Sequence, residues 1–193
     1  MRYTGDMRVA LINNGIKAPQ KLLELLAGHE VQVFDSAQAS EVESSAFDLM
    51  VLSGSSRFPI MGNEEALEPE FNLVLNSSIP VIGICYGCEL IARAFGGTLT
   101  DLGEGSKERT MVDIEVVQEH PMFGGRKSFQ AYDAHRWAIS DAGPNLSILA
   151  RSKHGPEVIQ HCIRPIFGLQ FHPEKMVDES YGDEVFRSIL TQL

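Results

Sequence analysis

"GICYGCELIARAFGG", residues 83–97, directly follows the short apolar run "SIPVI" at residues 78–82. The apolar run predicts a buried strand, and the apolar spacing that ends at Gly96 and Gly97 predicts a helix. The stretch therefore predicts a strand, a tight turn and a helix, the repeating unit of an α/β fold. Cys85 and Cys88 lie at the turn, and their role depends on the rest of the chain.

Short apolar runs and helical patterns alternate over the first half of the chain. The expected strands cover residues 8–13, 30–34, 47–52 and 80–84, and the expected helices cover 19–28, 63–77 and 86–97. Pro69 is expected to kink or divide the second helix. This alternation predicts an α/β fold of the flavodoxin-like kind, with an open, mostly parallel twisted sheet and helices on both faces.

The middle of the chain has a different pattern. Short strand-like runs follow one another closely, at residues 97–102, 109–117, 127–132, 146–152 and 156–163. They predict a small antiparallel region, a hairpin or a flap. A last buried strand is expected at 166–171 and a closing amphipathic helix at 181–193, so residues 1–193 are expected to form a single domain.

Composition and charge exclude several classes of protein. The 193 residues carry a net charge of −10, which disfavours binding to nucleic acid or to anionic membranes. No apolar run approaches the ~20 residues of a membrane span, and the N-terminus lacks a signal-peptide pattern. Three cysteines do not form a disulfide framework. We therefore expect a cytoplasmic protein with reduced thiols.

Three separate segments are expected to meet at one edge of the sheet, because ligands of such sheets bind at the carboxyl ends of the strands. Cys85 follows the fourth expected strand, the loop at Gly54 follows the third, and His172 follows the last.

The pair Cys85 and Cys88 allows three interpretations. A Cys-x-x-Cys redox motif at a helix start is typical of thioredoxin-like proteins, but there the motif follows an early strand. A zinc site needs about four ligands, and neither a second cysteine pair nor a His-x₃₋₅-His pair accompanies these two. We expect no metal and no cofactor.

The third interpretation is a nucleophile elbow, because Gly83 and Gly87 flank Cys85 in the pattern Gly-x-nucleophile-x-Gly. Glycine fits both flanking positions because the turn is too sharp for side chains there. The backbone N–H of Tyr86 would then face an oxyanion formed on a substrate carbonyl. The dipole of the following helix would favour the thiolate.

"GLQFHPE", residues 168–174, supports the third interpretation. A cysteine nucleophile needs a base, and the base needs an acceptor that orients it. His172 and Glu174 supply both at the same predicted edge as Cys85, whereas either residue alone would read as an ordinary surface residue.

"GICYGCE" together with "GLQFHPE" resembles the class I (triad-type) glutamine amidotransferase family, and "GICYG" is especially similar to the glutaminase domain of GMP synthetase. "HPMFGG", "AHRW" and "YGDEVFRSIL" add to the likeness, which extends from Val9 to Leu190. The resemblance implies that Cys85 is the nucleophile, His172 the base and Glu174 its orienter.

The resemblance also implies the reaction and the substrate contacts. Attack on the γ-amide of glutamine gives a thioester and ammonia, and hydrolysis gives glutamate. The backbone N–H groups of Tyr86 and of Gly54 and Ser55 would hold the oxyanion. Ala134 and His135 would offer backbone contacts to the α-carboxylate.

Two positions depart from the family. Family members usually have Gln four residues after the nucleophile, in contact with the amino-acid end of the substrate, and this chain has Glu89 there. The GMP synthetase group tends to have Asp where this chain has Trp137. Cys88 and Cys162 match no family function, and we expect both to be small buried hydrophobic residues.

Two enzyme functions remain open at this point. One is a glutaminase subunit that supplies ammonia to a separate ATP-dependent synthetase subunit, since this chain has no phosphate-binding Gly-Lys loop. The other is a free-standing γ-glutamyl hydrolase that acts on a γ-glutamyl amide other than glutamine. A silent binding module is disfavoured because the Cys-His-Glu set is intact.

Overall fold

The computed structural model describes residues 6–16, 19–55, 57–103 and 110–193. The helices are α1 (Gln20–Leu25), α2 (Glu68–Asn76), α3 (Tyr86–Ala94) and α4 (Gly182–Leu190). The strands are β1 (Arg8–Asn13), β2 (Glu30–Asp35), β3 (Leu49–Leu52), β4 (Val81–Ile84), β5 (Thr98–Asp101), β6 (Thr110–Val116), β7 (Ser128–Asp133), β8 (Trp137–Asp141), β9 (Leu146–Ser152), β10 (Gly155–His161) and β11 (Ile166–Leu169). Arg109, the first residue of the strand-like run expected at 109–117, lies outside the described residues.

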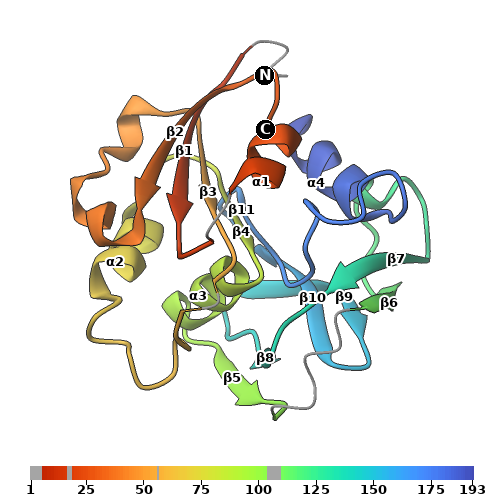
Figure 1. The fold of residues 1–193 in the computed structure, drawn as a ribbon. Helices are drawn as coiled ribbons and strands as arrows, with labels where there is room; N and C mark the ends of the chain where they lie inside the picture. Colours follow the sequence, from red (N-terminus) through yellow and green to blue (C-terminus); the bar gives the residue numbers. More distant parts are fainter. Residues whose placement is uncertain (1–5, 17–18, 56, 104–109) are drawn as a thin grey trace.

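Within the described residues, the main sheet has nine strands in the order β2-β1-β3-β4-β11-β10-β9-β6-β7. The strands from β2 to β11 pair in parallel, and the strands from β11 to β7 pair antiparallel. Figure 1 shows the sheet running across the molecule with helices on either side. The predicted α/β class, with helices on both faces of a sheet, is confirmed.

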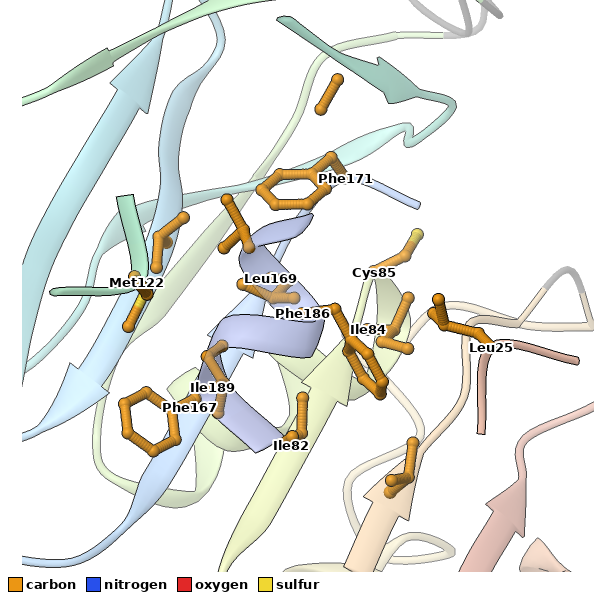
Figure 2. Packing of buried hydrophobic residues seen from close by; sticks show 14 of the residues in the cluster. Leu25, Ile82, Ile84, Cys85, Met122, Phe167, Leu169, Phe171, Phe186 and Ile189 are labelled. Carbon is orange, nitrogen blue, oxygen red and sulfur yellow. The ribbon is translucent and has the colours of Figure 1, made fainter. Parts of the chain in front are cut away.

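Strand residues alternate between two apolar cores, one on each face of the sheet. In β3, Leu49 and Val51 belong to the core under α1 and α4, whereas Met50 and Leu52 belong to the core under α2 and α3. Figure 2 shows Phe186 and Ile189 of α4 packed over the strand residues of the first core. Because both faces are covered, the parallel strands are buried along their length, as in "LMVL" of β3.

The antiparallel region predicted for the middle of the chain is confirmed, and most of its strands join the main sheet. Strands β10, β9, β6 and β7 extend the main sheet beyond β11, and β5 pairs with β8 in a separate two-stranded sheet. The sequence analysis missed β8, which begins at Trp137 and is held by pairing with the distant strand β5. Four of the antiparallel strands thus continue the main sheet directly from its parallel half.

Two helix boundaries differ from expectation. Pro69 does not divide a helix but lies in the first turn of α2, where its missing N–H costs no hydrogen bond. Residues 63–67, expected as helix, are not helical, and residues 64–67 form a turn before α2. Helix α1 ends at Leu25, and Gly28 lies three residues further on with a φ of +94°.

The order of the strands brings three loops together. Strands β3, β4 and β11 are neighbours and run parallel, so the loops after their carboxyl ends meet at one edge. These loops carry Gly54, Cys85 and His172, and the predicted convergence is confirmed. Within the described residues, the structure has no helix long and apolar enough to cross a membrane.

Candidate active site

Cys85 lies on a strained turn between β4 and α3. Its backbone has φ +51° and ψ −106°, in a region that residues with a side chain rarely occupy. A Cβ on Gly83 would lie 2.4 Å from the backbone of Gly87, and a Cβ on Gly87 would lie 2.4 Å from the carbonyl oxygen of Leu52. Both glycines are therefore needed for the turn to close against β3.

The turn presents the sulfur at the end of the strand. The backbone N–H of Cys85 donates to the carbonyl of Leu169 in the neighbouring strand β11, at 2.7 Å. Figure 2 shows Cys85 beyond Ile84, with its sulfur at the margin of the apolar cluster. The thiol is buried but lies on the wall of a pocket.

His172 and Glu174 form a buried pair next to Cys85. Nδ1 of His172 lies 2.8 Å from Oε1 of Glu174, and each residue is 8% exposed. The backbone N–H of His172 donates to the carbonyl of Tyr132 at the end of β7. Because an ionised Glu174 can only accept, Nδ1 carries the hydrogen and Nε2 keeps a free lone pair.

Gly54 lies between the cysteine and the histidine. A Cβ placed on Gly54 would lie 3.2 Å from Cε1 of His172 and 3.6 Å from the Cβ of Cys85. A larger residue here would crowd both side chains. Gly54, Ser55 and Tyr86 all line the same pocket, so the three backbone positions expected around the oxyanion lie together.

The electrostatic surroundings set different pKa values for these groups. Burial, together with the nearby carboxylates of Glu89, Asp133 and Glu174, raises the pKa of the Cys85 thiol well above its ordinary value. The expectation that the helix start favours the thiolate is thus outweighed, although the N–H of Tyr86 acts in that direction. Burial would raise the pKa of Glu174, but the hydrogen bond and charge of His172 leave it below its ordinary value.

The pocket has a volume of about 500 Å³ and contains most of the predicted site residues. Those on its wall are Gly54, Ser55, Cys85, Tyr86, Glu89, Ala134, His135 and His172. Glu174 lies behind His172 as its partner. The lining residues that the sequence analysis did not assign to the site are Ile16, Arg57, Phe58, Pro59, Arg136 and Lys175, and Trp137, noted there only as a departure, also lines it.

The family model of class-I glutamine amidotransferases matches residues 10–192 of this chain. The chain belongs to this family. One relative, a subunit of the glutamine-hydrolyzing GMP synthase of Pyrococcus abyssi, is 35% identical over 145 residues, which cover 72% of this chain and 72% of the relative. The same subunit of Methanococcus maripaludis strain C6 is 33% identical, over 93% of this chain and 94% of the relative.

Solved structures share the fold of this class-I glutamine amidotransferase. A crystal structure from Thermoplasma acidophilum aligns with a TM-score of 0.82 and 23% identity, covering 97% of this chain and 94% of that one. A glutamine amidotransferase from Thermotoga maritima aligns with a TM-score of 0.77 and 18% identity, covering 96% of each chain. At these identities the likeness concerns the fold.

Glu89, where family members usually have Gln, is buried in the pocket wall. The residue is 4% exposed, and its Oε1 accepts a hydrogen bond from Nε2 of Gln170 at 3.1 Å. Burial raises the pKa of Glu89 to about 7, although Gln170 and His135 act in the opposite direction. Glu89 therefore does not face solvent on the helix.

Asp133, His135 and Glu157 form a buried cluster behind Glu89. Their imidazole nitrogen and carboxylate oxygens lie within 4.8 Å of one another, so we considered them as ligands of a metal ion. Nδ1 of His135 and Oδ1 of Asp133, however, lie 2.5 Å apart, closer than the ~3.3 Å between two ligands on a tetrahedral zinc ion. The cluster is therefore better described as a direct histidine–carboxylate pair, with Glu157 held by Ser152 at 2.6 Å.

The two other cysteines differ from each other. Cys88 is fully buried in the core under α2 and α3, as expected. Cys162 is exposed, so the expectation of a buried residue was wrong. The reason is that β10 ends at His161 and Cys162 already lies in the turn that leads to β11.

Proposed function

We propose that this chain is a glutaminase subunit that hydrolyses the γ-amide of glutamine through a thioester on Cys85 and supplies ammonia to a separate ATP-dependent synthetase subunit. The observation that carries the proposal is the elbow that holds Cys85 beside the buried His172–Glu174 pair in one pocket. No metal or cofactor enters the proposal, because the three side chains suffice for acyl transfer.

The first step forms the thioester. Nε2 of His172 takes the proton of the Cys85 thiol, and the sulfur attacks the γ-carbonyl carbon of glutamine. The backbone N–H of Tyr86, with the loop at Gly54 and Ser55, stabilises the negative oxygen. Because the pKa of the thiol is raised, proton removal by His172 is needed at neutral pH.

The second step releases ammonia and glutamate. The tetrahedral intermediate collapses, the C–N bond breaks, and the proton on His172 goes to the leaving nitrogen as ammonia departs. A water molecule, deprotonated by His172, then attacks the thioester and frees glutamate and the thiol. Glu174 holds the imidazole in one tautomer and stabilises its charged form throughout.

The comparisons support a GMP synthetase subunit as the protein that receives the ammonia. Each of the two relatives named above is one subunit of a glutamine-hydrolyzing GMP synthase, which implies that a further subunit exists. They match this chain over most of their own length, in line with a single amidotransferase domain over residues 1–193. The synthetase partner is accordingly of the GMP synthetase type, and the net charge of −10 disfavours nucleic acid and anionic membranes as partners.

The test measures glutamate release and GMP formation. The purified chain is assayed with glutamine alone, with the ATP-dependent GMP synthetase subunit of the same organism, and with both. We expect glutamine to support GMP formation only when both proteins are present, whereas ammonium salts support it without this chain. Release of glutamate from another γ-glutamyl amide, with glutamine inert, would instead favour a free-standing hydrolase.

A further inference from the structure

Asp133, His135 and Glu157 lie buried beside the pocket, and their side chains take no part in the two proposed steps. The three residues are 4%, 4% and 1% exposed. Of these three, only His135 lines the pocket. Burying ionisable groups costs free energy unless they are paired, and where they are paired they can fix one arrangement of the chain.

The segment that contains His135 joins the two sheets. Residues 134–136, the connector, run from the end of β7 in the main sheet to the start of β8 in the two-stranded sheet, and all three line the pocket. One end of the connector is held at the surface, where Nη2 of Arg136 lies 2.6 Å from Oδ2 of Asp101 in β5. The other end is held in the interior, where Nδ1 of His135 lies 2.5 Å from Oδ1 of Asp133. The position of this part of the pocket wall therefore depends on the Asp133–His135 pair.

Glu157 lies against this pair from β10. An oxygen of its carboxyl group lies within 4.8 Å of a carboxylate oxygen of Asp133 and a ring nitrogen of His135. Oε1 of Glu157 accepts a hydrogen bond from the hydroxyl of Ser152 in β9 at 2.6 Å, and its backbone carbonyl accepts one from the N–H of Gln170 at 2.8 Å. The other oxygen, Oε2, has no hydrogen-bond partner among the described residues and remains available to the pair. Glu157 is thus fixed to two neighbouring segments beside the pair.

The charges of the cluster suit a supporting role for Glu157. Burial and the charge of Asp133 raise the pKa of Glu157 to about 8, although His135 and Ser152 act in the opposite direction. Burial would lower the pKa of His135, but Asp133, Glu157 and Glu89 leave it above its ordinary value. Near neutral pH, Glu157 is therefore protonated and offers a donor to the pair without adding a second negative charge.

We propose that Glu157 is a positioning residue, which supports the Asp133–His135 pair and thereby keeps the connector in place as a wall of the substrate pocket. The inference rests on the proposed glutaminase function and adds to it a residue that does not itself line the pocket. Glu157 is not among the groups that shift the pKa of the Cys85 thiol. Its loss should therefore weaken the binding of glutamine, seen as a higher KM, and leave kcat nearly unchanged.

Trp137 reports on the connector without any need for turnover. It is the only tryptophan in the chain, follows the connector directly and lines the pocket. The first experiment measures its emission spectrum and its quenching by acrylamide in the wild type, Glu157→Ala and Glu157→Gln. We expect Glu157→Ala to shift the emission and increase the quenching, because the connector loses its support. Glu157→Gln should stay close to the wild type, because an amide has the shape of a protonated carboxyl group and also donates and accepts.

Glu70→Ala is the matched control for this experiment. Glu70 is also buried, at 4% exposed, with a pKa raised to about 7 and an Oε2 atom without a hydrogen-bond partner among the described residues, but it lies on α2. Its loss should leave the emission of Trp137 unchanged. An unchanged emission in Glu157→Ala, or an equal change in Glu70→Ala, would overturn the proposal.

The second experiment measures kcat and KM for glutamine. We expect KM to rise at least about tenfold in Glu157→Ala with kcat within about threefold of the wild type, and Glu157→Gln to restore KM at neutral pH. An unchanged KM in Glu157→Ala would contradict the proposal. If Glu157→Ala fails to fold, Ser152→Ala, which removes the hydrogen bond to Oε1 of Glu157, takes its place in both experiments. If the wild type turns over no glutamine, the glutaminase function fails, whereas the emission of Trp137 still reports on Glu157.

The third experiment follows KM as a function of pH. The titratable groups around Glu157 and His135 come from β7, α3 and the turn between β9 and β10, and they are Asp133, Cys88, Glu89 and His154. Above its pKa of about 8, Glu157 loses its proton and places a second negative charge beside Asp133, which a glutamine side chain cannot do. We therefore expect the KM of the wild type to rise relative to that of Glu157→Gln between about pH 7 and about pH 9. If the two proteins gave parallel profiles, the proposal would fail.

Discussion

The two sides of Cys85 carry buried carboxyl groups with opposite properties. Glu174 and Glu89 are 8% and 4% exposed, and burial acts to raise the pKa of both. The pKa of Glu174 nevertheless lies below its ordinary value, whereas that of Glu89 rises to about 7. Two carboxyl groups that are buried to a similar degree near Cys85 therefore have pKa values shifted in opposite directions.

The difference comes from the partners. His172 donates to Glu174 and can carry a positive charge, so it stabilises the ionised carboxylate. Gln170 donates to Glu89 but stays neutral, and one neutral hydrogen bond does not compensate for burial. Glu174 thus has a hydrogen-bonded imidazole as its partner, whereas Glu89 has a neutral amide as its hydrogen-bond donor and His135 acts on it through charge alone. Substitutions on either side test this contrast, and their expected effects decrease in the order given.

The largest effect is expected for Cys85→Ala, which should abolish glutamine turnover while leaving the fold intact. The reason is that Cys85 alone lies on the strained turn that both carboxyl groups flank. Glutamate release and circular dichroism spectra check the two halves of this expectation. Cys88→Ala is the control, and it should keep most of the activity because Cys88 is buried in the opposite core. Loss of turnover in Cys88→Ala alone would reverse the assignment.

His172→Ala should lower the rate by about 10²–10⁴, the usual effect of removing a general base. It also removes the imidazole that hydrogen-bonds to Glu174. Single-turnover measurements of thioester formation are the appropriate assay. A variant that keeps a near-normal rate would show that another group takes the proton of the thiol.

The two carboxyl groups should make the free energy of unfolding change with pH in opposite directions. The folded protein keeps a proton on Glu89 between its ordinary pKa of 4.5 and about 7, whereas the unfolded chain loses it. The free energy of unfolding therefore falls as pH rises through this range, by up to about 3 kcal/mol, and Glu89→Gln should remove that loss. Urea unfolding of both proteins at pH 5 and pH 8 measures the difference.

Glu174 should show the reverse. Because its pKa is lowered in the folded protein, its stabilising effect is present above the ordinary value of 4.5 and disappears as pH falls through the folded pKa. Glu174→Gln should therefore cost stability at neutral pH and less in acid. If both variants showed the same pH trend, the contrast between the two sides would be wrong.

The smallest effect is expected on the rate of Glu174→Gln, about tenfold. An amide can still accept the hydrogen bond from Nδ1 of His172 and orient the ring, but it cannot stabilise the imidazolium. The measurement is kcat for glutamine, compared directly with that of His172→Ala. A loss as large as that of His172→Ala would mean that orientation, rather than charge, is what Glu174 supplies.

The sequence predicted the parts of the site that depend on local pattern. The turn at Cys85 requires glycine at positions 83 and 87, because a Cβ at either position would collide with neighbouring backbone. His172 could be placed near Cys85 because parallel strands bring their carboxyl ends to one edge. The parallel half of the fold was predictable for the same reason, as its strands are short apolar runs between helices.

Other features depend on contacts between distant segments and left no local signal. The pairing of Glu89 with Gln170 joins residues 81 positions apart, and the cluster around His135 joins β7 with β10. Strand β8 was missed because Trp137 begins a strand that pairs with distant β5. Cys162 was misjudged because composition alone does not locate the end of β10.

The position of β11 in the sheet has a consequence for how the protein is made. Strand β4 pairs with β11 from Val81↔Ile166 to Ile84↔Leu169. The strand before the nucleophile can therefore complete its pairing only after about 85 further residues have been synthesised. Such distant pairings make folding slow, and a chain still emerging from the ribosome cannot complete them. His172 and Glu174 lie beyond that partner strand. The nascent chain therefore carries its cysteine long before it carries the histidine and glutamate that complete the site.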